Sequence, residues 1–143
     1  MSDLDERRNL ITATWAAAWD RGEVDALDDL LSPEYRRKSS PTEEGLDLAA
    51  FKASILAARS AFPDLKTTIE QIVIEGDSAA VRWRSHGRHD HGFLGVPATH
   101  RDVEVHGATF ARFQGDKVVE ELVTWDPRAL LSAIGIISVG QDS

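Results

Sequence analysis

The chain has 143 residues, of which 42% are hydrophobic and 28% charged, and its formal charge at pH 7 is −8. This length predicts a single domain, residues 1–143, with its own hydrophobic core. The acidic balance argues against nucleic acid or an anionic membrane as the main partner, because both require a dense cationic face.

The sequence contains no cysteine, which excludes disulfides, thiolate nucleophiles and cysteine-ligated metals. The first residues are charged and lack the apolar core of a signal peptide. No run approaches the ~20 apolar residues of a membrane-spanning helix. We therefore expect a cytoplasmic protein without a membrane partner.

Helical patterns come first along the chain. Residues 4–19 place apolar side chains at helical spacing, and Gly22 ends this helix. The same spacing predicts two more helices, 23–31 and 46–62. A short strand, 35–39, is expected between them.

After the third helix the apolar period changes to two, which is typical of strands. The pattern predicts four strands, at 65–75, 78–89, 102–114 and 117–125. A loop or flap, 92–100, separates the middle two, and a helical turn, 128–134, follows the last. This order predicts an α+β fold, with three helices laid against a curved antiparallel sheet.

All five histidines fall between His86 and His106, and an apolar strand ending at Asp126 follows. Histidine titrates near neutrality, and burial can raise the pKa of a carboxyl group into the same range. Asp126 is therefore our candidate general acid/base. The alternative is that Asp126, which precedes Pro127, caps the terminal helix.

Two histidines are candidate catalytic partners of Asp126. His89 shares strand parity with the apolar positions of its strand, and His106 lies on the strand beside the one that ends at Asp126. The alternatives are a rim position for His89 and the solvent face for His106. His86 has the opposite parity to His89, so at most one of them points inward. The two histidines of the flap are expected on the surface.

A metal site is not expected. The run His86-x-x-His89-x-His91 lacks the order found in zinc hydrolases, and an extended strand turns His86 away from the other two. No serine lies on a sharp nucleophile turn either. These patterns favour neither a metal centre nor a serine nucleophile.

Several runs resemble the SnoaL-like polyketide cyclases over nearly the whole chain. They are the opening run between Trp19 and Tyr35, then Val81–Thr99 (VRWRSHGRHDHGFLGVPAT), Phe110–Glu120, Trp125-Asp126 and Leu130–Gly135. The resemblance implies the cone-shaped fold of the nuclear-transport-factor-two-like superfamily, in which a curved sheet and about three N-terminal helices enclose a pocket.

In these cyclases the aspartate matching Asp126 acts as general acid/base in an intramolecular aldol ring closure. The resemblance thus implies a cofactor-independent cyclase or isomerase acting on a small hydrophobic or aromatic carbonyl substrate. Core packing is the alternative role for most of the candidate substrate-binding residues. These are Trp15, Trp19, Tyr35, Phe62, Trp83, Phe93, Phe110 and Leu122.

The chain departs from the family pattern at three points. Arg36-Arg37-Lys38-Ser39 stands where a histidine is frequent, and Pro97-Ala98-Thr99-His100 replaces Pro-x-Thr-Gly. Ala111 stands where the cyclases commonly carry a histidine, which leaves His106 or His89 to substitute for it.

Two other functions stay open. One is a related enzyme, either a cofactor-independent hydroxylase or oxygenase or an epoxide-opening enzyme. The other is a non-catalytic module that binds a small molecule. The resemblance also implies a homodimer, because open sheets in this superfamily are commonly protected by association.

Overall fold

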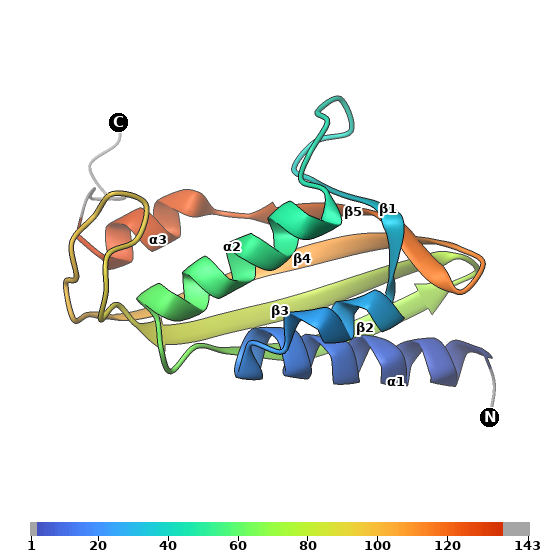
Figure 1. Ribbon diagram of the computed structural model, residues 1–143, viewed down its shortest axis with the longest axis horizontal. Coiled ribbons are helices and arrows are strands. Elements are labelled where there is room, and N and C mark those ends of the chain that lie inside the picture. The colour runs from blue at the N-terminus through green and yellow to red at the C-terminus, as the bar shows by residue number, and fades with distance from the viewer. Residues whose placement is uncertain (1–2, 136–143) are drawn as a thin grey trace.

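The computed structural model describes residues 3–135, which form one five-stranded sheet with all helices on one of its faces (Figure 1). The strand order is β1-β5-β4-β3-β2. The strands are β1 (Leu31–Lys38), β2 (Lys66–Glu75), β3 (Ser78–Arg88), β4 (Asp102–Gln114) and β5 (Lys117–Trp125). The helices are α1 (Asp3–Trp15), its π-helical continuation η1 (Ala16–Asp20), the 3₁₀ helix η2 (Val24–Asp29), α2 (Leu48–Ala61) and α3 (Pro127–Ala133). The predicted α+β architecture is confirmed.

The sheet is open and mixed. β2 to β5 pair antiparallel, as the turn spacing predicts. β1 pairs parallel with β5, so the expectation of a purely antiparallel sheet does not hold at this edge. The chain enters β1 directly from η2, beside the start of β5, where the Val118 amide donates to the Leu30 carbonyl. β1 therefore begins at Leu31, inside the predicted second helix.

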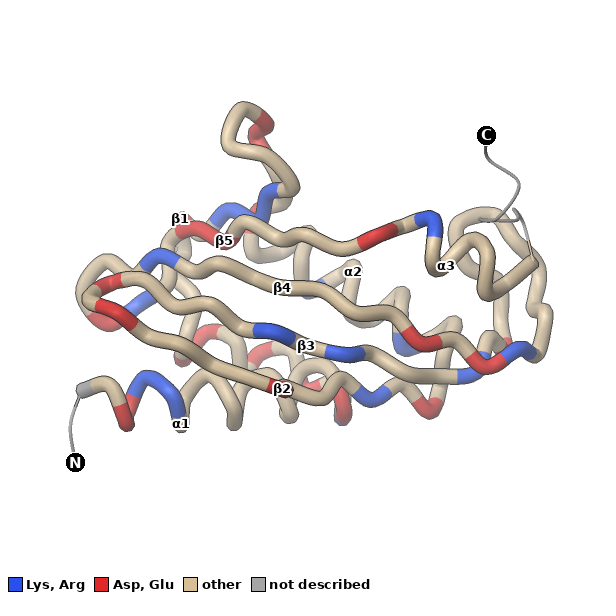
Figure 2. The backbone as a smooth tube through the Cα atoms, turned by 180° about the vertical axis from the view of Figure 1, so that it is seen from behind, with Lys and Arg blue, Asp and Glu red and all other residues tan. Residues whose placement is uncertain are grey.

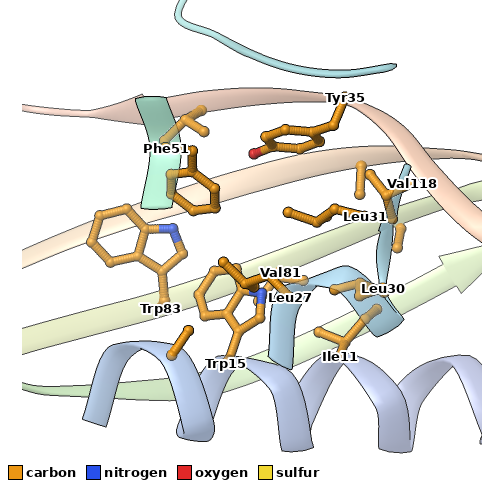
Figure 3. Close-up of a cluster of buried hydrophobic side chains, with 14 of the residues drawn as sticks. Ile11, Trp15, Leu27, Leu30, Leu31, Tyr35, Phe51, Val81, Trp83 and Val118 are labelled. Carbon is orange, nitrogen blue, oxygen red and sulfur yellow. The ribbon is translucent and has the colours of Figure 1, made fainter. Parts of the chain in front are cut away.

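Alternation along each strand assigns side chains to two faces of the sheet. On β3, Ala79, Val81 and Trp83 are buried against the helices. Figure 3 shows the hydrophobic core that the inner face of the sheet forms with the helices. Basic residues of β3 lie between acidic residues of β2 and β4 (Figure 2), and Arg82 and Arg84 pair with Glu70 and Glu104 across the strands. Burying each large apolar side chain stabilises the fold by roughly 1.5–3 kcal/mol, so the helices are held to the inner face.

A second apolar cluster lies near the C-terminal end of the described chain. It joins the end of α2 to α3 and to the start of β4. Its members are Ala61, Phe62, Leu65, Val103, Leu130 and Ile134. This cluster fixes α3 against the start of β4 and the end of α2. No helix within residues 3–135 is long and apolar enough to span a membrane.

Gly107 on β4 allows the Trp83 indole to lie directly against the neighbouring strand. The two residues are Cα partners, and a Cβ atom at position 107 would sit 2.3 Å from Trp83 Cζ2 and 2.8 Å from the Thr124 carbonyl oxygen. The indole Nε1 donates to Thr109 Oγ1 at 3.1 Å, which fixes the ring. A side chain at position 107 therefore cannot be accommodated without displacing Trp83.

We expect Gly107→Ala to lower the free energy of unfolding by about 1–3 kcal/mol, the usual cost of overpacking. Urea denaturation followed by circular dichroism measures this. Gly92→Ala is the matched control, because the added Cβ would meet only the Val96 carbonyl oxygen at 3.5 Å. Equal stability of the two variants would contradict the steric argument.

Candidate functional site

A cavity of about 280 Å³ lies between the inner face of the sheet and the helices. Its volume is near the lower end of the range for small-molecule sites, about 300–1,000 Å³. The wall is mainly apolar and includes all four tryptophans of the chain. The aromatic residues are Trp15, Trp19, Phe51, Phe62, Trp83, Phe93 and Trp125. We call this space the aromatic cavity.

Several elements place these rings. Trp15 ends α1 and Trp19 lies one turn later in η1, so both side chains point to the same side of the helix. Trp19 meets Phe51 of α2 edge to face, with ring centroids 6.1 Å apart. Phe62 and Phe93 form a second edge-to-face pair at 5.4 Å, which brings the loop after β3 onto the cavity wall.

A second cavity, of about 390 Å³, adjoins the first. The two share Arg37 and Trp125 as wall residues. The rest of the second wall comes from β1, β5 and the loop after β1: Lys38, Ser39, Glu43, Gly45, Leu46 and Val123. We call this space the polar cavity, because charged side chains and backbone form much of its wall.

Arg37, Glu121 and Tyr35 meet beside the two cavities, and of the three only Arg37 is itself a wall residue. Arg37 and Glu121 are Cα partners across the β1–β5 pair, and both face inward. Arg37 Nη1 donates to Glu121 Oε1 at 3.3 Å, and the Tyr35 hydroxyl donates to the same oxygen. Glu121 is only 4% exposed, and the Arg37 guanidinium lies over the Phe51 ring at 4.4 Å. We call these three residues the carboxylate cluster.

The protonation of Tyr35 follows from this environment. Burial, and then the negative charge of Glu121, raise the pKa of the Tyr35 hydroxyl far above its ordinary value. The phenol therefore stays protonated and remains a donor to the carboxylate. Its ring packs against Phe51, with centroids 5.6 Å apart, so Tyr35 lies behind the cavity wall.

The sequence profile of the SnoaL-like polyketide cyclases matches residues 9–134. The chain belongs to the SnoaL-like polyketide cyclase family. A comparison with curated proteins found no match.

Solved structures agree with this assignment. AclR of Streptomyces galilaeus, described as a candidate hydroxylase, shares 29% identity at a TM-score of 0.83, over 95% of this chain and 100% of that one. TsrD of Streptomyces laurentii shares 27% identity at a TM-score of 0.84, over 96% and 100%. IdmH of Streptomyces antibioticus, described as a candidate polyketide cyclase, shares 25% identity at a TM-score of 0.74, over 90% and 98%.

In this SnoaL-like chain, Asp126 lies outside the wall of either cavity. It is exposed, and its Oδ1 accepts a hydrogen bond from the Arg128 amide at 2.9 Å, as the N-cap of α3. Pro127 starts the helix, so the preceding carboxylate turns toward the free amides of the first turn. The geometry matches the capping alternative.

His89 is fully buried, but it is not part of the wall of the aromatic cavity. Its ring stacks on Phe62 with centroids 5.3 Å apart. Nδ1 accepts from the Thr99 amide at 3.3 Å and lies 2.9 Å from Thr99 Oγ1. Nε2 is buried and has no hydrogen-bond partner among the described residues. In this position His89 anchors the base of the loop that carries Phe93.

His106 lies on the outer face of the sheet. Its side chain is 60% exposed, and its nitrogens lie 3.8 Å from Glu70 and 3.5 Å from Glu104. It pairs with Arg84, an outward residue of β3, so alternation directs it away from both cavities. The expectation that His106 lies beside the reaction centre therefore does not agree with its placement.

The other three histidines, His86, His91 and His100, are exposed. His86 is exposed and forms part of the wall of the aromatic cavity, whereas His89 is buried and does not. His91 and His100 are exposed on the loop, as expected. A hydrogen bond from His100, and then one from Arg88, hold the pKa of Asp90 below its ordinary value. Within residues 3–135, no group of three or more potential ligands is placed to hold a metal ion.

The predicted substrate-binding residues divide by face. Five line the aromatic cavity: Trp15, Trp19, Phe62, Trp83 and Phe93. Tyr35 lies behind this wall, as described above. Phe110 and Leu122 are Cα partners on the outer face, because the inward positions next to them are held by Thr109 and Val123. These two residues therefore do not reach either cavity.

Residue-by-residue inspection of the sequence missed Arg37, Phe51 and Glu121. A usable signal existed for Glu121, because it alternates with Val123 and Trp125 on an otherwise apolar strand. A charged residue at an inward position of a strand requires a partner. The partner, Arg37, lies 84 residues earlier in the chain, and only the parallel pairing of β1 with β5 brings it there.

Tyr35 is the only tyrosine, so alkaline titration reports on it alone. We expect no tyrosinate absorbance near pH 10 in the folded protein, whereas the unfolded chain ionises at about pH 10. Above that pH the unfolded state has lost a proton that the folded state retains. The free energy of unfolding therefore falls as pH rises, by up to about 1.4 kcal/mol per pH unit.

The control is Tyr35→Phe, which lacks this contribution to the alkaline loss of stability. At neutral pH this variant removes one donor from buried Glu121, at a cost of about 1–3 kcal/mol. Both quantities come from urea denaturation over a series of pH values. Tyrosinate formation near pH 10 in a protein that is still folded would contradict the burial of this hydroxyl.

Proposed function

We propose that this chain is a cofactor-independent enzyme that closes a ring by an aldol-type reaction, or isomerises, a hydrophobic carbonyl-rich substrate. The observation that supports this proposal is the carboxylate cluster beside an aromatic cavity. A buried, inward-facing carboxylate next to a largely apolar site is the arrangement that proton transfer from carbon requires.

The chemistry needs one group that accepts and returns a proton. The carboxylate removes a proton from a carbon between two carbonyl groups, which leaves an enolate. The enolate carbon attacks a second carbonyl of the same molecule, and the new carbon–carbon bond leaves an alkoxide. The alkoxide takes the proton back from the carboxylic acid, so no oxidant, reductant or metal enters the balance.

We assign the proton-transfer role to Glu121 in place of Asp126. Tyr35 and Arg37 both donate to Oε1, which leaves Oε2 without a hydrogen-bond partner among the described residues. An anchored carboxylate with one oxygen available has a fixed orientation and still accepts a proton. Asp126 has the opposite arrangement, since it is exposed and accepts the Arg128 amide. It remains the competing assignment.

The aromatic cavity supplies the second requirement. A flexible polyketone closes the intended ring only if the reacting carbons are held together, and rigid aromatic walls provide this positioning. Trp15 and Trp83 are almost fully buried, so their rings are fixed by the core behind them. The wall also keeps water from the enolate.

Similarity to AclR favours hydroxylation as a second candidate function. That reaction would add an oxygen atom from O₂ and would require a source of two electrons. The mass of the product separates the two functions, because ring closure or isomerisation adds no oxygen.

We expect Glu121→Gln to slow proton abstraction by about 10²–10⁴-fold, the usual contribution of a general base. The readout is exchange of the central protons of a naphthyl 1,3-diketone with D₂O, followed by NMR. Asp126→Asn is the matched control, because asparagine caps a helix about as well as aspartate and preserves α3. A large loss in Asp126→Asn with full activity in Glu121→Gln would return the role to Asp126.

We also propose that the chain forms a homodimer through the outer face of the sheet. A row of apolar residues crosses four strands there: Val73, Ala80, Phe110 and Leu122 are successive Cα partners. Val73 and Phe110 are each 52% exposed. Side chains of both charges flank the row, including Arg82 and Glu120. Such a face is complementary to a second copy of itself.

Size-exclusion chromatography with light scattering tests the homodimer. We expect a dimer for the wild type and a monomer for Phe110→Lys, because two ammonium groups would face each other across the apolar row. Leu94→Lys is the control, since Leu94 is exposed on the loop and away from the sheet. A monomeric wild type, or a dimeric Phe110→Lys, would rule out this interface.

A further inference from the structure

Arg37 occupies the junction of the two cavities. It contributes to the wall of both, and its side chain remains 17% exposed. Contact with the Phe51 ring at 4.4 Å holds it in place. An arginine stacked on an aromatic ring keeps its N–H groups free at the edge of the guanidinium plane.

Most of these N–H groups have no protein acceptor. Arginine carries five N–H donors, and the one side-chain bond of Arg37 within residues 3–135 runs from Nη1 to Glu121. Glu121 is also bound by Tyr35, so the carboxylate charge is shared between two donors. The guanidinium therefore has donors available for a ligand.

The charged residues around the aromatic cavity indicate the sign of the charge that the ligand carries. Among the described residues that form its wall, Arg37 is the one lysine or arginine, the exposed His86 is the one histidine, and none is an aspartate or glutamate. In the polar cavity, Lys38 pairs with Glu120 at 3.1 Å, and Glu43 accepts the Ser39 amide. Arg37 is thus the cation that meets a ligand held against the aromatic rings.

We propose that Arg37 is the anion-binding residue of this site, which selects ligands that join a flat aromatic body to a carboxylate. The aromatic body occupies the tryptophan-lined cavity, and the carboxylate binds the guanidinium at its boundary with the polar cavity. Arginine and carboxylate match in geometry as well as charge, and the apolar surroundings strengthen the interaction. This inference deepens the proposed function by naming a substrate class, and it uses the same cavity.

The test compares 2-naphthoate with 2-naphthamide, which have the same rings and nearly the same shape but differ in charge. Each displaces the neutral fluorophore N-phenyl-1-naphthylamine. Because all four tryptophans line the aromatic cavity, energy transfer from tryptophan to the fluorophore reports occupancy of this site. We expect naphthoate to displace the fluorophore at a roughly tenfold lower concentration, the order expected of one charge-assisted hydrogen bond.

Arg37→Met should reduce this preference to about one while naphthamide binding stays within about threefold, because the apolar wall is preserved. Arg36→Met is the matched control, since the adjacent Arg36 faces outward and its one ion pair within residues 3–135 is with exposed Glu44. It should leave the tenfold preference unchanged. If circular dichroism shows that Arg37→Met is unfolded, Arg37→Gln replaces it, with the same expected loss.

A wild-type protein that binds the two competitors equally would overturn the inference, and so would a preference that survives Arg37→Met. The assay involves no turnover. If the Glu121→Gln experiment contradicts the proposed reaction, the assignment of Arg37 is unaffected. If the two competitors bind equally, the acid/base role of Glu121 is still decided by the exchange experiment.

Discussion

The parallel pairing of β1 with β5 is the contact on which the candidate site depends. It places Arg37 opposite Glu121 and brings Tyr35 within hydrogen-bond distance of the same carboxylate. Removing a carboxylate from water costs several kcal/mol, and the two donors to Oε1 offset part of this cost. Apolar residues could fill the same space at a lower cost, which is a reason to seek a functional role for these groups.

Strand alternation then determines which residues meet the cavity. On β3 it turns Trp83 inward, and on β4 and β5 it turns Phe110 and Leu122 outward. The same rule removes His106 from the interior. Gly107 lets the Trp83 ring close the wall against β4. The same strand pairing therefore directs the aromatic side chains and Arg37 toward the cavities and places a separate row of apolar side chains on the outer face.

The position of Asp126 is explained by the backbone of α3, although its residue type suggested a catalytic role. The start of a helix leaves free amide groups, and a carboxylate one residue before Pro127 satisfies one of them. His89 has a similar structural task, because Thr99 and Phe62 hold it at the base of the loop. Side chains that are suited to proton transfer by type are here engaged in supporting the wall.

The sequence by itself determined the α+β class and the four antiparallel strands, because these follow from periodicity along the chain. It also carried the family resemblance, since that rests on runs of neighbouring residues. Only the tertiary structure decided the parallel edge and the carboxylate cluster. Arg37 and Glu121 lie 84 residues apart, and no local sequence pattern specifies that β1 pairs with β5.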